Sequence, residues 1–299
     1  MIVDVHHHIL PPPFVASCRE EIVAFAGSDE VLDWTPERAL EDLDRLGIDR
    51  AYTSLGVPGV PTAPVARACN EYAAELAREH PGRFGTFATL PLPSVSESLA
   101  EIEYACDVLG VDGFGLLTTY GERRIGDPLF APVFEELDRR GAVIHLHPTA
   151  PAPCRGLIPG FGEPFLEFPF DTTRAVASLI YGNILPRLSN LRLILSHGGG
   201  PLAILARRLA APAAMRGGVP DVPAALRLLY TDVVTVTDPI PFDAVSRQFG
   251  SDHLLLGTDY PYVPPPMTLD GLAALGLDEP VGAGVAGGSA LQLLGRGSR

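Results

Sequence analysis

The stretch Ile2-Val3-Asp4-Val5-His6-His7-His8 opens the chain and sets the interpretation of everything that follows. It is a short β-rich run that ends in polar side chains, a pattern typical of a buried strand. Because side chains alternate along a strand, His6 and His8 are expected on one face and His7 on the other. Two imidazoles on the same face can bind one metal ion.

Seven similar runs follow, and amphipathic stretches lie between them. The predicted strands are 2–6, 50–55, 85–90, 113–117, 143–147, 193–197, 229–233 and 254–259, and the predicted helices are 36–46, 63–80, 95–109, 129–139, 172–188 and 202–209. This alternation favours parallel βαβ units with right-handed crossovers. Eight such units predict an α/β fold, a (β/α)₈ TIM barrel, with residues 1–299 as a single domain.

An open doubly wound sheet is the alternative fold. Its dinucleotide sites carry a G-x-G-x-x-G turn, whereas the glycine cluster after the sixth predicted strand reads His197-Gly198-Gly199-Gly200. The glycine spacing therefore favours the closed barrel.

The charged residues restrict the chemistry. The formal net charge is −14, and all 22 basic residues are arginines. Without lysine the chain has no side chain for a Schiff base, and it lacks the carbamylated lysine that bridges two metals in related barrels. The negative charge disfavours nucleic acid as a partner, and an anionic substrate needs a local positive centre.

Two features bear on the cellular setting. No apolar run reaches the roughly 18 residues of a membrane helix, and no basic leader precedes the first strand, so we expect a cytoplasmic protein without a membrane partner. The four cysteines are Cys18, Cys69, Cys106 and Cys154, and none forms a C-x-x-C pair. This spacing predicts reduced thiols.

Polar side chains recur where predicted strands end. His147 ends the fifth strand and is a better metal-ligand candidate than His145. We expect His145 to pack in the core or to contact a metal ligand rather than the metal itself. His197 ends the sixth strand and suits an acid or base, and Asp259 ends the eighth and can bind a metal or carry a proton. In a barrel these strand ends share one face, where active sites are built.

The expected cofactor is one divalent metal. Three imidazoles, from His6, His8 and His147, and the Asp259 carboxylate form a mixed nitrogen and oxygen set. Such a set favours Zn²⁺, with Mn²⁺, Fe²⁺ or Co²⁺ as alternatives. The loaded site would carry about one net positive charge, which matches an anion.

Several segments resemble the aminocarboxymuconate-semialdehyde decarboxylase family of the amidohydrolase superfamily. They read IVDVHHHILP at 2–11, WTPE at 34–37, HP at 147–148, SHGGG at 196–200 and GTDYP at 257–261. Within that family, GLLTTYG at 115–121 and LEFPFDTTR at 166–174 look most like 6-methylsalicylate decarboxylase-type members. The resemblance spans nearly the whole chain.

This resemblance implies roles for individual residues. It implies a metal bound by His6, His8, His147 and Asp259, with His197 beside it as a catalytic group. It also implies a homodimer, in which an arginine after the glycine-rich turn, by register Arg208 or else Arg207, enters the neighbouring subunit's site. Ala39 and Glu41 stand where the founding decarboxylase has arginines for a dicarboxylate, which favours a substrate with one carboxylate.

The predicted activity is that of a carboxy-lyase, the non-oxidative decarboxylation of a 2-hydroxybenzoate-like acid. Asp259 is expected to deliver a proton to the ring carbon and His197 to relay it. The candidate substrate-binding residues are Arg174 and Arg208 for the acid group and Tyr120, Phe161, Phe165 and Phe168 for the ring. The alternatives are a mononuclear metal-dependent hydrolase of an amide or lactone, and a non-catalytic metal-binding barrel.

Overall fold

Parallel strands form the main sheet of this protein, whose computed structural model describes residues 1–216 and 221–295. The strands of this sheet are β1 (Val3–His8), β2 (Arg50–Ser54), β3 (Phe84–Thr89), β4 (Gly113–Leu117), β7 (Val143–His147), β8 (Arg192–Leu195), β9 (Tyr230–Asp232) and β10 (Leu254–Leu255). They pair in chain order, and all of their ladders are parallel. A two-residue hairpin, β5 (Thr119–Tyr120) with β6 (Arg123–Arg124), follows β4.

Backbone hydrogen bonds between β1 and the segment that follows β10 close the barrel. Val5 N donates to Leu256 O at 3.0 Å, and Asp259 N donates to His6 O at 2.7 Å. His8 N donates to Tyr260 O, also at 2.7 Å. The segment after β10 therefore continues alongside β1, and the predicted (β/α)₈ barrel is confirmed.

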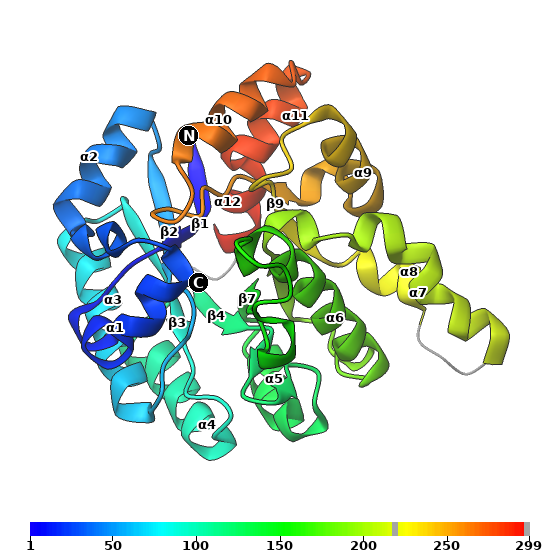
Figure 1. The fold of residues 1–299 in the computed structure, drawn as a ribbon, viewed down its shortest axis with the longest axis horizontal. Helices are drawn as coiled ribbons and strands as arrows, with labels where there is room; N and C mark the ends of the chain where they lie inside the picture. Colours follow the sequence, from blue (N-terminus) through cyan, green and yellow to red (C-terminus); the bar gives the residue numbers. More distant parts are fainter. Residues whose placement is uncertain (217–220, 296–299) are drawn as a thin grey trace.

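The helices surround this barrel on its outer side (Figure 1). They are α1 (Pro12–Ala26), α2 (Pro36–Leu46), α3 (Ala63–Glu79), α4 (Val95–Tyr104), α5 (Ala131–Arg139), α6 (Glu167–Tyr181), α7 (Leu202–Arg216), α8 (Val222–Leu226), α9 (Pro239–Phe249), α10 (Pro265–Ala274), α11 (Glu279–Ala283) and α12 (Ser289–Leu294). Helix α2 has the predicted bounds because Thr35 caps its first turn and Gly47 ends it with φ 69°. Helix α6 begins at Glu167 rather than at residue 172.

Apolar side chains fill one end of the barrel. Val5, Phe87 and Val143 pack together with Leu293 of α12, and all four are buried. Polar side chains occupy the other end, as β7 shows by passing from Val143 to His145 and His147 along one face. Barrel closure therefore gathers imidazoles at the carboxyl ends of the strands.

An irregularity in β1 interrupts the regular alternation of its side chains between the two faces of the strand. The register with β2 shifts between Asp4 and His7, which leaves one extra residue in β1. Val5 and His6 can therefore both reach the barrel interior, where the His6 ring lies 4.5 Å from the His145 ring. His7 lies with Asp4 instead, 3.1 Å from its carboxylate.

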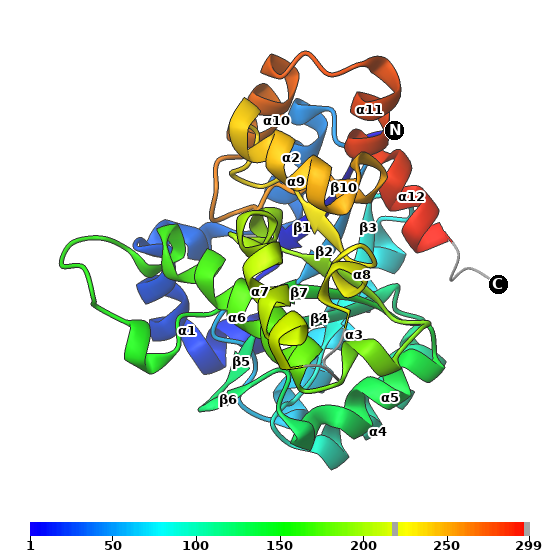
Figure 2. The same cartoon turned by 90° about the vertical axis from the view of Figure 1, so that its right-hand side faces the viewer.

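The long connection after β7 extends away from the barrel (Figure 2). It contains two short 3₁₀ turns, Ala152–Cys154 and Glu163–Phe165. Within the described residues no helix is long and apolar enough to span a membrane. All four cysteines are free thiols.

Candidate metal centre

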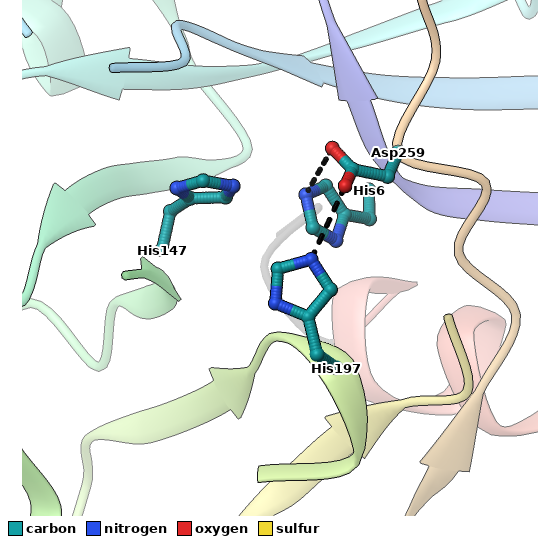
Figure 3. Close-up of side chains that lie close together, drawn as sticks. All are labelled: His6, His147, His197 and Asp259. Atoms are coloured by element: carbon teal, nitrogen blue, oxygen red, sulfur yellow. Dashed lines mark hydrogen bonds and ion pairs between the residues drawn. The ribbon is translucent and has the colours of Figure 1, made fainter. Parts of the chain in front are cut away.

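Four side chains from distant parts of the sequence converge at the polar end of the barrel (Figure 3). His6, His147, His197 and Asp259 are all buried, and each contributes an atom within 4.8 Å of the atoms of the other three. His6 comes from β1 and His147 from the end of β7. The segment after β10 contributes Asp259, and the turn after β8 contributes His197.

His8 joins the same cluster. Its Nε2 atom lies 3.0 Å from His6 Nε2 and 3.1 Å from Asp259 Oδ1. Its ring lies 4.9 Å from the His147 ring. The four residues predicted as ligands, His6, His8, His147 and Asp259, are therefore all present at one place.

Hydrogen bonds at Nδ1 orient these imidazoles. His6 Nδ1 lies 2.8 Å from Asp232 Oδ2, and His147 Nδ1 donates to the Pro148 carbonyl at 2.8 Å. His8 Nδ1 lies 3.3 Å from Ser54 Oγ. When Nδ1 holds the proton, the lone pair of a neutral imidazole is on Nε2, and each Nε2 is then available to a metal.

The donor atoms fit a cation. Asp259 Oδ1 is buried and accepts no hydrogen bond, although His6 Nε2 lies 3.2 Å and His8 Nε2 3.1 Å away. An unsatisfied buried carboxylate oxygen beside two close imidazole nitrogens is costly in free energy. A divalent ion between them satisfies all three, so the residues present suit one metal.

Burial and charge determine the protonation of the metal-free cluster. Burial lowers the pKa of His8, of His147 and of His145, the last to about 4, and keeps these rings neutral. Burial also lowers the pKa of His6, but Asp259 and Asp232 outweigh it and raise this pKa to about 10. A position that binds a proton this tightly also favours a cation.

The same charges act on the carboxyl groups. Burial raises the pKa of Asp259, but the charge on nearby His6 and the close imidazoles of His197 and His8 bring it well below the usual range. The pKa of Asp232 is also lowered, because the charge on His6, the nearby His145 ring and the hydrogen bond with His6 outweigh burial. Both groups are therefore carboxylates at neutral pH.

His197 stands in a tight turn rather than at the end of a strand as predicted. Strand β8 ends at Leu195, and His197 begins a 3₁₀ turn with φ 57°. Its Nε2 lies 3.2 Å from Asp259 Oδ2. The turn packs closely on α6, since a Cβ on Gly200 would stand 2.1 Å from Pro169 O, so this position requires glycine.

Two of the six candidate substrate-binding residues lie near this cluster. The Phe168 ring is 5.7 Å from the His147 ring, and Phe168 packs with Val57, Leu117 and Ala150. Tyr120 contacts the same apolar group, and its hydroxyl accepts a hydrogen bond from Leu117 N at 2.9 Å. Phe168 is therefore the aromatic side chain placed to contact a ring.

The other candidates are farther out. Arg174 is 41% exposed and lies 3.6 Å from Glu167, and no hydrogen bond or ion pair joins it to the cluster within the described residues. Arg207 and Arg208 are exposed on α7. Phe161 and Phe165 are 48% and 75% exposed and pack on each other, so within this chain they do not enclose a ring.

The sequence did not lead us to Asp232, although this residue contacts a predicted metal ligand. It is fully buried at the end of β9. The position carried a usable signal, because the carboxyl end of a predicted strand is the criterion that selected Asp259.

Comparison with known proteins decides the family. Residues 3–296 match the family model described as amidohydrolase. The chain belongs to the amidohydrolase family. Decarboxylase yanB of Aspergillus niger is 36% identical to it, over 86% of this chain and 70% of its own. The 6-methylsalicylic acid decarboxylase of Penicillium expansum is 31% identical, over 98% of this chain and 96% of its own.

The fold comparison agrees with the barrel geometry. A crystal structure named amidohydrolase II has a TM-score of 0.92 and 26% identity to this amidohydrolase, and the match covers 99% of this chain and all of the other. The relatives named as decarboxylases confirm the resemblance to the decarboxylase family of this superfamily and, within it, to 6-methylsalicylate decarboxylase-type members.

Proposed function

We propose that this amidohydrolase is a metal-dependent carboxy-lyase that removes CO₂ from a small aromatic acid of the 2-hydroxybenzoate type. The observation that carries the proposal is the convergence of His6, His8, His147 and Asp259 with His197 beside them. Relatives named as decarboxylases support it.

The substrate class follows from the charges and surfaces at the site. The cation would be held by His6, His8, His147 and Asp259, and when bound it would supply a positive centre for the carboxylate and ortho oxygen of the acid. Phe168 offers an apolar surface to the ring beside His147. A flat anion with one carboxylate suits this combination.

His197 and Asp259 are the residues proposed to hold the proton and transfer it to the substrate. Loss of CO₂ directly from an aromatic ring leaves an unstabilised carbanion, so the ring carbon must first gain a proton. His197 Nε2 and Asp259 Oδ2, 3.2 Å apart, can hold that proton between them, and Asp259 passes it to the carbon that bears the carboxylate. The electrons of the broken carbon–carbon bond then restore the aromatic ring as CO₂ leaves.

The assay is CO₂ release from a panel of 2-hydroxybenzoates in D₂O. The proposal requires CO₂ and a phenol with one deuterium at the carbon that lost the carboxylate. Lactone or amide hydrolysis without CO₂ release would instead establish the mononuclear hydrolase.

Three finer assignments belong to the same proposal. Zn²⁺ is the proposed ion because imidazole-rich sets with one carboxylate suit it, and metal analysis of the purified protein distinguishes it from Mn²⁺. Residues 1–299 are proposed to act as one barrel domain. A homodimer is proposed in which Arg208, exposed on α7, enters the site of the partner subunit to bind the acid group.

A further inference from the structure

The two carboxylate oxygens of Asp232 contact two different parts of the site. Oδ2 lies 2.8 Å from His6 Nδ1, and Oδ1 accepts hydrogen bonds from the backbone of His197 at 2.8 Å and of Val234 at 3.1 Å. The side chain is fully buried. Each oxygen therefore has its own partners.

The contact at Oδ2 determines which His6 nitrogen faces the cluster. A carboxylate can only accept, so His6 Nδ1 carries the hydrogen that points at Asp232. Nε2, 3.0 Å from His8 Nε2, is then the atom left for a cation.

The contact at Oδ1 acts on a different residue. His197 has φ 57°, a conformation that a histidine adopts only when its surroundings enforce it. The hydrogen bond from its backbone N–H to Asp232 ties this turn to the end of β9. The position of the His197 ring relative to Asp259 depends on that anchor.

Close packing around Asp232 leaves its side chain little room to move. A Cβ on Gly257 would stand 2.8 Å from the Cβ of His6 and 2.9 Å from the Cβ of Asp232. The three residues are packed as closely as their side chains allow, so Asp232 cannot turn away from His6 without disturbing the barrel wall.

We propose that Asp232 is a positioning residue that presents His6 Nε2 to the metal through one carboxylate oxygen and fixes the His197 turn through the other. The inference rests on the proposed metal centre and adds to it a residue outside the ligand set. The inference has two parts, the orientation of His6 and the anchoring of the His197 turn, and two variants of Asp232 distinguish them.

Asp232→Asn keeps the shape and one of the two functions. The amide oxygen can still accept from the His197 backbone, while the amide NH₂ now faces His6 Nδ1 and, because it donates, favours the tautomer with hydrogen on Nε2. We expect Co²⁺ affinity, measured by visible absorption on titration of the stripped protein, to fall by about 10- to 100-fold. Activity at saturating Co²⁺ should largely return.

Asp232→Ala removes both functions. We expect the same or greater loss of Co²⁺ affinity, together with a lower kcat that saturating Co²⁺ does not restore, because the His197 turn has lost its anchor. Glu101→Gln is the matched control, since Glu101 is a carboxylate with 2% exposure that binds Arg67 and Asn70 instead. Its Co²⁺ affinity should stay within twofold of the wild type.

Three results would overturn the inference. Wild-type Co²⁺ affinity in a folded Asp232→Asn protein would show that Asp232 does not orient His6. Binding of two Co²⁺ ions to the wild type and one to Asp232→Asn would make Asp232 a ligand of a second ion with His6 and His145, which also lie within reach of it. Absence of Co²⁺ binding to the wild type would remove the metal centre itself, and the proposed function with it.

Discussion

His197 Nε2 lies 3.2 Å from Asp259 Oδ2, and both residues have left-handed backbone conformations, with φ of 57° and 59°. Such angles are uncommon outside glycine and carry a free-energy cost of about 1–3 kcal/mol each. The fold therefore enforces this contact from both sides. Removing one side chain should leave the other in place.

His197→Ala should stop turnover without emptying the metal site. Since His197 is proposed to share the proton with Asp259, kcat for CO₂ release should fall by about 10²- to 10⁴-fold. Metal content, measured by elemental analysis, should remain that of the wild type. His80→Ala, which alters the end of α3, is the control and should retain activity. Full activity in His197→Ala would exclude a catalytic role.

Gly257→Ala should disrupt the metal centre through packing alone. The added Cβ has no room between His6 and Asp232. Overpacking of this kind costs about 1–3 kcal/mol, so both the melting temperature and the metal affinity should fall. Gly282→Ala is the matched control, because its Cβ would meet only Leu277, at 3.9 Å. Equal behaviour of the two variants would contradict the packing argument.

Phe168→Ala should weaken substrate binding more than it slows chemistry. Loss of the aromatic surface beside His147 removes apolar contact worth about 1.5–3 kcal/mol, so KM for the aromatic acid should rise roughly 10-fold or more. Phe165→Ala removes a ring that is 75% exposed and should leave KM within about twofold. Steady-state kinetics on both variants provide the comparison, and an unchanged KM in Phe168→Ala would refute the assignment.

Asp4→Ala should destabilise the barrel at its closure. The Asp4 carboxylate accepts from Thr258 N at 3.0 Å, from Thr258 Oγ1 at 2.6 Å and from His6 N at 3.0 Å. Each buried donor left without a partner costs about 1–3 kcal/mol, so the free energy of unfolding should fall by at least ~3 kcal/mol. Denaturant unfolding measures this loss, and a change below ~1 kcal/mol would show that Asp4 is not needed for closure.

Subunit complementation tests the proposed role of Arg208. If each site takes Asp259 from one subunit and Arg208 from the other, Asp259→Asn and Arg208→Ala should both be inactive alone. Mixing and refolding the two should restore part of the activity, because some dimers are then mixed and each mixed dimer contains one intact site. Arg207→Ala mixed with Asp259→Asn is the comparison. Failure of every mixture to regain activity would contradict a shared site.

The sequence could predict the barrel and the convergence of the four candidate ligands because both follow from simple periodicity. Strands at regular spacing imply the parallel barrel, and the alternation in β1 puts His6 and His8 together. The strand-end rule then selected His147 and Asp259. These features depend on local pattern and on topology, which sequence carries directly.

The features that the sequence did not predict depend on contacts between distant residues, which no local sequence pattern shows. Helix α1 begins in a run of three prolines, which resembles a loop in sequence although proline suits a first helical turn. The extra residue in β1 and the left-handed turn at His197 are visible only once β2, α6 and Asp232 are in place. The exposure of Phe161 and Phe165 likewise depends on the path of the connection after β7, which composition does not determine.

The most direct test of the central claim is a joint titration of metal-stripped protein with a divalent cation, in which bound metal and CO₂ release from a 2-hydroxybenzoate are followed together. We predict that CO₂ release is absent at the start, rises in proportion to bound metal and reaches its plateau at one ion per chain. CO₂ release by the stripped protein, or saturation of one ion per chain without CO₂ release from any acid of the panel, would contradict the account.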